Sequence, residues 1–440
     1  MKILAISGLT LRTAVRSRVF GLLAAMVVLC IGGLPLVIKS DGTAAGQTQL
    51  FIYYAFGLTM TLLSIAAAWS AAGAIALEVS GRQMHVLVTK PVHAAEIWLG
   101  KWLGLMAVNL VMLVLAGGLI YGLLCWTTRS AVLPAGDRAG LREKILTAHS
   151  LVAPEQPAPS GAKRAMSVVP PDGKQTWIFR VPERALSGDA LFLQFQFATS
   201  RIERQMPVTG LWLITTDDAL SPLRVQGSYT PHVRHALKLP PAVPGQRLTV
   251  TYHNVETAAP GTPGMPGTPG APETSGAPAT VLFAADTGAQ LVIRESGFES
   301  NFIRALLLVL ARLAFFSALG LTVGSLFSFP VAVFTALAFL FITGLSGWIG
   351  GGALAAEAGL APAWLAGLLN AATAGIVQLA HLVTPPLARF EPLDFLPSGA
   401  FIPWMLVGTA WGVLALGYGG ALAVLGAWLF SRRELGLAAN

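Results

Sequence analysis

The histidines are the side chains whose types and spacing come closest to a metal site. His232 and His235 are separated by two residues, and one further ligand would complete a weak site, but two solvated histidines beside arginines are the simpler interpretation. His253 falls in an alternating segment and His381 near the end of an apolar one, and neither is expected to be a ligand. The chain also lacks the GxxxxGK[ST], HExxH and GxSxG motifs. We therefore expect no enzymatic activity, no metal site and no cofactor bound by this chain.

Two polar residues within long apolar segments are stronger candidates for function. Arg312 lies about eight residues inside the segment 305–326, and a charge at that depth is costly unless it faces protein or water. We expect it to face a translocation path or an acidic partner; the alternatives are a helix that begins later or a side chain that reaches out to the interface. Asn109 is expected to hydrogen-bond between helices, with a position along the same path as the alternative.

The composition indicates that these residues belong to a membrane protein. Hydrophobic residues make up 54% of the chain and charged residues 11%, whereas soluble domains contain about 25% charged residues. A helix needs about 20 apolar residues to cross the hydrocarbon core of a bilayer. Six segments meet this requirement and predict an all-α bundle of six transmembrane helices: Val19–Val37, Phe51–Leu77, Trp102–Trp126, Ala305–Leu326, Val331–Ile349 and Phe401–Phe430.

The positions of the positive charges predict the orientation of this bundle. Arginines precede the first span, Arg82, Lys90 and Lys101 lie between the second and third, and Arg432 and Arg433 follow the last. By the positive-inside rule, both termini and the segment 78–101 are cytoplasmic, as in a multi-pass inner-membrane protein. Arg432 and Arg433 would anchor the last helix at anionic lipid headgroups. The net charge of +8 is explained by this placement, so we expect no nucleic-acid binding.

Two segments at the edges of the bundle complete its expected organisation. Residues 1–18 place apolar side chains opposite arginines, which favours an amphipathic elbow on the inner surface, with a charged leader lacking helix as the alternative. Residues 353–398 include the apolar stretch Ala363–Val383, which would reverse the C-terminus if it crossed the membrane. We expect it to form a re-entrant or interfacial segment on the outer side. Residues 431–440 form a cytoplasmic tail.

The segment 127–298 separates the third and fourth spans and is expected to lie outside the cytoplasm. After a possible short helix at Gly140–His149, its apolar and polar residues alternate in short runs bounded by Gly, Pro and Asp. This pattern predicts an inserted all-β domain of the sandwich or jelly-roll type. The runs are Gln175–Val181, Ala190–Ala198, Thr209–Thr215, Arg247–Val255, Thr280–Ala284 and Gln290–Arg294.

The segment 78–101, EVSGRQMHVLVTKPVHAAEIWLGK, is longer and more patterned than a simple hairpin connection requires. Its order of an acidic residue, a glycine, an apolar run, a proline, a second acidic residue and Gly-Lys resembles the cytoplasmic coupling segment of type-2 ABC transporter permeases. An ordinary interfacial loop, whose basic residues only set topology, is the alternative. The residues that carry the resemblance are Glu78, Gly81, Val86–Val88, Pro91, Glu96, Gly100 and Lys101.

Two C-terminal segments extend this resemblance over most of the membrane half. Tyr418–Glu434 is similar to the last helix of such permeases, and residues 385–399 look like the loop before that helix in the group associated with multicopper-enzyme maturation. The inserted β-domain is not covered by the resemblance, so the substrate does not follow from it.

The resemblance implies a permease subunit that forms a dimer with a second copy or a homologue. It also implies that a separate ABC ATPase, which binds ATP and Mg²⁺, docks at Glu78, Gly81, Arg82, Lys90, Pro91, Glu96, Gly100 and Lys101. A second hypothesis has the same topology without transport: a membrane-anchored scaffold whose β-domain binds a protein or a glycan.

Overall fold

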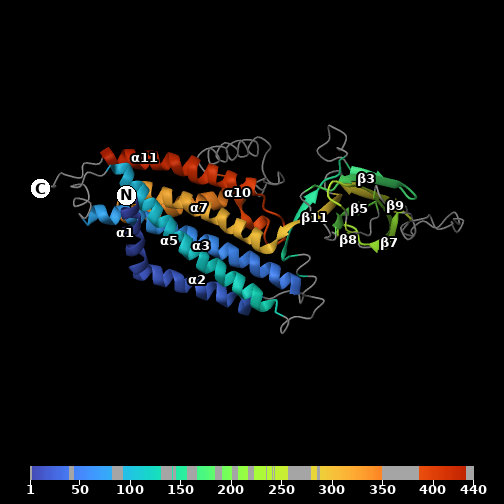
Figure 1. The fold of residues 1–440 in the computed structure, drawn as a ribbon, viewed down its shortest axis with the longest axis horizontal. Coiled ribbons are helices and arrows are strands. Elements are labelled where there is room, and N and C mark those ends of the chain that lie inside the picture. The colour runs from blue at the N-terminus through green and yellow to red at the C-terminus, as the bar shows by residue number, and fades with distance from the viewer. Residues whose placement is uncertain are drawn as a thin grey trace, which may run out of the picture. The chain divides into compact units, whose positions relative to one another are not determined.

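The chain divides into two compact units, seen here in a computed structural model. Unit 1 comprises Met1–Thr147 and Phe298–Asn440, and unit 2 comprises Ala148–Gly297. Unit 1 is built from helices and unit 2 mainly from strands (Figure 1). The described residues are 2–38, 44–81, 93–129, 141, 145–155, 166–183, 191–200, 207–216, 222–233, 235–239, 241, 243–255, 279–284, 288–348 and 386–432.

Unit 1 begins with a short helix that turns sharply into the first long one. Helix α1 spans Lys2–Arg16 and α2 spans Arg18–Val37. Ser17 between them is extended, and its hydroxyl accepts a hydrogen bond from the backbone N–H of Phe20, which caps the start of α2. The separate α1 agrees with the elbow expected at 1–18. Its expected apolar stripe is only partly buried, because Leu4 and Leu9 are exposed.

Four further helices form the body of unit 1 and run alongside one another (Figure 1). They are α3 (Ala44–Ser80), α5 (Ala94–Thr127), α7 (Phe298–Leu326) and α8 (Phe329–Trp348). Two short 3-10 turns follow at η2 (Leu387–Phe390) and η3 (Pro392–Asp394). The last span is continuous but irregular: α10 (Trp404–Ala410), a π-helical stretch η4 (Trp411–Tyr418) and α11 (Gly419–Arg432).

Five helical spans in the described part of the chain are long and apolar enough to cross a membrane. They are Arg18–Val37, Ala44–Ser80, Ala94–Thr127, Phe298–Leu326 and Trp404–Ser431. The span expected at Val331–Ile349 corresponds to α8, whose apolar part Phe329–Gly344 is shorter than the other five. A multi-pass membrane protein is therefore supported, and the sixth crossing remains a prediction. The stretch Ala363–Val383 lies outside the described residues.

Small residues let α3 and α7 approach closely along the centre of unit 1. A Cβ on Gly320 would lie 2.7 Å from the carbonyl oxygen of Ala68, and one on Gly324 would lie 2.5 Å from that of Ala72. The two glycines are four residues apart, as in the small-xxx-small motif of packed membrane helices. From the first contact to the second, the residue number rises by four in both helices, so α3 and α7 run parallel to one another.

The strands of unit 2 form antiparallel sheets around an aromatic core. The sheet orders are β1-β11-β4-β8, β2-β10-β5 and β3-β9-β6-β7. Trp212 of β6 is fully buried, and its ring centroid lies 4.4 Å from that of Phe195 in β4, which belongs to a different sheet. The strands are β1 (Thr147–Val152), β2 (Met166–Val169), β3 (Lys174–Arg180), β4 (Leu191–Phe195), β5 (Phe197–Thr199), β6 (Val208–Thr216), β7 (Leu223–Tyr229), β8 (His235–Leu239), β9 (Arg247–Asn254), β10 (Val281–Ala284) and β11 (Ala289–Gly297).

The alternating sequence pattern located the central strands of unit 2 and missed strands at its borders. The six expected runs coincide with β3, β4 with β5, β6, β9, β10 and β11. The helix expected at Gly140–His149 is wrong at its C-terminal end, because β1 begins at Thr147 and buries Thr147 and Ala148. The edge strands β7 and β8 were missed although β7 alternates apolar and polar residues: Gly227 interrupts its apolar face, and β8 is only five residues long.

Unit 2 should fold without the helices of unit 1. Its core draws side chains from all three sheets, and both cysteines of the chain, Cys30 and Cys125, lie in unit 1. We expect a fragment spanning residues 145–297 to be soluble, to give a β-type circular dichroism spectrum and to melt cooperatively, with no change on adding a reducing agent. A helical or unfolded spectrum would contradict an independent β-domain.

Candidate functional site at the end of the α3–α5 hairpin

Helices α3 and α5 are both longer than a membrane crossing requires. At 1.5 Å per residue, their 37 and 34 residues correspond to more than about 50 Å of helix each, against about 30 Å of hydrocarbon. The C-terminal part of α3 and the N-terminal part of α5 carry Glu78, Glu96 and Lys101. We call this part of unit 1 the α1 end, because α1 packs there with Ile75 of α3 and Trp98 of α5.

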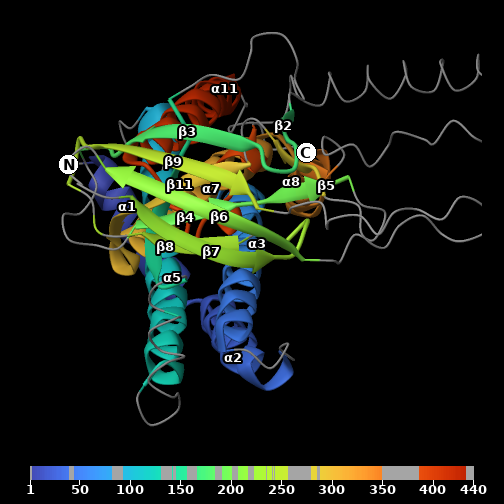
Figure 2. The same ribbon diagram turned by 90° about the vertical axis from the view of Figure 1, so that its right-hand side faces the viewer.

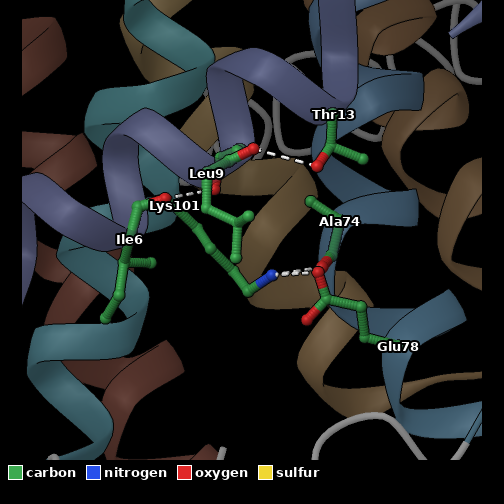
Figure 3. A network of polar contacts seen from close by, with 7 residues as sticks. Ile6, Leu9, Thr13, Ala74, Glu78 and Lys101 are labelled. Carbon is green, nitrogen blue, oxygen red and sulfur yellow. Dashed lines mark hydrogen bonds and ion pairs between the residues drawn. The ribbon is translucent and has the colours of Figure 1, made fainter. Parts of the chain in front are cut away.

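An ion pair joins the two helices of the hairpin at the α1 end. The Nζ atom of Lys101 lies 2.5 Å from Oε1 of Glu78 and donates a second hydrogen bond to the carbonyl oxygen of Ala74, at 2.8 Å (Figure 3). The side chain of Lys101 is 4% exposed, whereas that of Glu78 is 33% exposed. Lys101 therefore holds α5 to the last turns of α3, and only Glu78 retains a surface that a partner could contact.

Helix α1 lies directly across the start of α5. A Cβ on Gly100 would lie 2.8 Å from the side chain of Ile6, and a Cβ on Gly104 would lie 2.6 Å from Cβ of Thr10. Only glycine allows this approach, so Gly100 and Gly104 form a second small-xxx-small contact. Gly100 is thus used within the chain, and Gly104 is a site residue that the coupling pattern did not include, although its GxxxG spacing is visible in the sequence.

Of the remaining residues of the expected coupling segment, Glu96 and Gly81 belong to the described part of the chain. Glu96 closes a capping box at the start of α5, where its Oε2 accepts a hydrogen bond from the backbone N–H of His93 at 3.0 Å. Gly81 follows α3, and its N–H donates to the carbonyl oxygen of Leu77. Arg82, Lys90 and Pro91 lie outside the described residues, as does Arg433, while Arg432 is the last residue of α11.

The second expected site, at Arg312, lies in the middle of α7. Because α7 begins at Phe298, Arg312 is well inside the helix, which excludes the alternative of a later start. The Nη1 atom of Arg312 donates a hydrogen bond to Sδ of Met60 at 3.6 Å. The Nε atom of Arg312 is buried without a hydrogen-bond partner among the described residues. The guanidinium also lies 5.7 Å from the ring centroid of Phe316. These are weak contacts for a buried cation.

Glu391, between η2 and η3, provides the charge complementary to Arg312. Burial raises the pKa of the Glu391 carboxyl, the positive charge of Arg312 opposes that shift, and the Asp394 carboxylate adds to it. Asn109 does not join this pair: its side-chain amide donates to Oγ of Ser317 at 2.9 Å, linking α5 to α7. The interhelical role expected for Asn109 is therefore what its contacts support.

The sequence reasoning missed a polar clasp at the N-terminal end of α7. The fully buried Asn301 accepts a hydrogen bond from the N–H of Ile402 and donates one to the carbonyl oxygen of Ala400, both at 2.8 Å. Arg304 donates to the carbonyl oxygen of Ile402 and lies between the rings of Phe401 and Trp404. The clasp fixes the approach to the last span. No sequence motif predicts the clasp, because the hydrogen-bond partners of Asn301 and Arg304 in it are backbone atoms.

Within the described residues, no group of three or more His, Cys, Asp or Glu side chains is placed to hold a metal ion. No family model matches the chain, and no curated protein matches it either.

Proposed function

We propose that this chain is the membrane subunit of an ATP-driven exporter of the type-2 ABC class. The observation that carries the proposal is the bracing of the α3–α5 hairpin at the α1 end. The Lys101–Glu78 ion pair ties the two helices together, and α1 lies across Gly100 and Gly104 of α5. A push on the connecting residues 82–92 would therefore move α1, α3 and α5 together.

In this proposal a separate ABC ATPase docks on the cytoplasmic side at the segment 78–101. Glu78, Arg82, Lys90, Pro91 and Glu96 provide the contacts, while Lys101 and Gly100 hold the helices behind them. ATP and Mg²⁺ bind to the ATPase and not to this chain. The permease acts as a dimer of six-span subunits with cytoplasmic termini, and unit 2 lies outside the inner membrane.

The buried Arg312 marks the path of the substrate in this proposal. A charge in the middle of a membrane helix with one weak sulfur acceptor is retained at a cost in stability, which favours a functional role. Its position against Met60 of α3 and the influence of Glu391 indicate that the path runs beside α3 and α7. Asn109 supports the α5–α7 contact through Ser317 of α7.

The test is the recovery of an ATPase with the full-length chain. We expect a protein that contains a phosphate-binding GxxxxGK[ST] loop to co-purify with the chain from its native membrane in mild detergent, at near-equal amounts. Recovery of extracytoplasmic proteins or glycans without any ATPase would favour the scaffold hypothesis instead. The readout is mass spectrometry of the purified complex with quantification of both chains.

A further inference from the structure

The four-stranded sheet β3-β9-β6-β7 of unit 2 has one face in the core and one face in solvent. Figure 2 shows its strands in the order β3, β9, β6 and β7. Trp177, Trp212 and Tyr252 alternate inward and are buried. The outward positions are Lys174, Thr176, Ile178 and Arg180 on β3, Arg247, Thr249, Thr251 and His253 on β9, Thr209, Leu211, Leu213 and Thr215 on β6, and Arg224, Gln226 and Ser228 on β7. We call these residues the outer sheet face.

Positively charged residues lie side by side on adjacent strands of the outer sheet face. Arg180 and Arg247 are directly opposite partners in the β3–β9 register, and like charges in that relation destabilise a sheet. Arg247 lies 3.8 Å from Glu155, but both side chains are well exposed, so this pair offsets little. Among the described residues, no ion pair involves Arg180. The sheet therefore keeps two adjacent arginines at a cost to its own stability.

A further cation, Lys174, lies at the other end of the two strands. Lys174 is the direct partner of His253, whose Nε2 lies 3.0 Å from Oδ1 of the exposed Asp172. Lys174 and Arg180 are six residues apart on one strand, which is about 20 Å at 3.3 Å per residue. No acidic residue occupies any outward position of the four strands, and Arg224 on β7 adds a further cation.

Threonine hydroxyls and three aliphatic side chains, those of Ile178, Leu211 and Leu213, lie between these cations. Thr176 and Thr251 are opposite partners with their oxygens 3.0 Å apart, and Thr249 and Thr215 continue the array onto β6. The outer sheet face has no Phe, Tyr or Trp, whereas the energetic centres of protein–protein interfaces combine arginine with Trp and Tyr and are depleted of Lys. An array of cations and hydroxyls with only three aliphatic side chains suits a hydrophilic, extended anion better than a protein partner.

We infer that the outer sheet face binds an acidic polysaccharide. Carboxylate groups of the polymer would pair with Arg180 and Arg247 at one end and with Lys174 at the other, and its hydroxyls would hydrogen-bond to the threonines between them. Arginine is well suited to the first site, because its fork of N–H donors matches a carboxylate. The inference depends only on unit 2 and is independent of whether the chain is a permease or a scaffold.

The experiment uses the full-length chain in phosphatidylcholine nanodiscs and a fluorescein-labelled alginate oligosaccharide as the probe. We expect saturable binding in a fluorescence-anisotropy titration at 50 mM salt, weakened at 500 mM salt, and at least tenfold tighter than binding of neutral dextran. R180E/R247E should weaken alginate binding at least tenfold. The matched variant K238E/R294E changes the charge equally on outward positions of the β1-β11-β4-β8 sheet, and it should bind within twofold of wild type.

Three results would overturn the inference. Equal affinities for alginate and dextran would exclude charge recognition, and equal losses in both double variants would reduce the effect to net charge. Tighter binding of poly-L-glutamate than of alginate would assign the face to an acidic protein. If R180E/R247E fails to fold by circular dichroism, R180Q/R247Q replaces it with the same expected loss, and R180K/R247K should bind more weakly than wild type but more tightly than R180Q/R247Q.

Discussion

Replacing Glu78 with glutamine is expected to destabilise unit 1 more than replacing Lys101 with methionine. The variant E78Q leaves the ammonium of Lys101, which is 4% exposed, with the Ala74 carbonyl as its main acceptor, and an unpaired buried charge costs about 3 kcal/mol. The variant K101M leaves the Glu78 carboxylate, which is 33% exposed and can be hydrated, so we expect a loss of about 1 kcal/mol.

The double variant K101M/E78Q tests whether the effects of Glu78 and Lys101 on stability are coupled, as in an ion pair, or independent. With neither charge present, no buried charge lacks a partner, so the loss should be smaller than that of E78Q alone. The measurement is the free energy of unfolding of the full-length chain in mixed micelles, analysed as a double-mutant cycle. If the losses in the free energy of unfolding of the two single variants add up to that of the double variant, the two side chains act independently. This result would contradict an ion pair that braces α3 and α5.

Adding one methyl group at Gly324 is expected to separate α3 from α7. The Cβ of G324A would lie 2.5 Å from the carbonyl oxygen of Ala72, a backbone atom that cannot move without shifting its helix. Overpacking of this kind costs about 1–3 kcal/mol. Because α7 is largely buried within unit 1, we also expect this loss of packing to lower the thermal unfolding temperature of the purified chain.

The matched control is the same substitution at Gly118 in α5. No atom lies within 4 Å of the position that its Cβ would take, so G118A should be neutral or should stabilise the helix by up to about 1 kcal/mol. The same measurement in micelles compares both variants. Equal unfolding free energies for G324A and G118A would show that α3 and α7 are not in close contact at this point.

The sequence pattern predicted those helices and strands whose environment imposes a regular arrangement of apolar residues. Long apolar runs gave the helices, because a bilayer demands about 20 such residues, and strict alternation gave β4 and β9, which have one buried face. The edge strand β7 also alternates, but Gly227 interrupts its apolar face and none of its residues is fully buried. The residues of the coupling pattern were predicted without their contacts: spacing cannot reveal that Lys101 reaches back 23 positions to Glu78 or that Gly104 receives Thr10.

The measurement that tests the central claim is ATPase recovery with the charges of the connecting segment reversed. The variant R82E/K90E changes the charge of this segment and leaves Glu96 in place, because Glu96 also caps α5. Like charges placed across a complementary interface cost several kcal/mol of association. The control K238E/R294E makes the same charge change in unit 2. Cysteine labelling at Ser228 from outside intact cells, with Ser80→Cys shielded, checks that the orientation is unchanged.

We expect the ATPase to co-purify equally with wild type and K238E/R294E, and at least tenfold less with R82E/K90E at the same membrane level. Equal recovery with all three chains would contradict docking at the end of the α3–α5 hairpin, and no ATPase with wild type would contradict the proposed function itself.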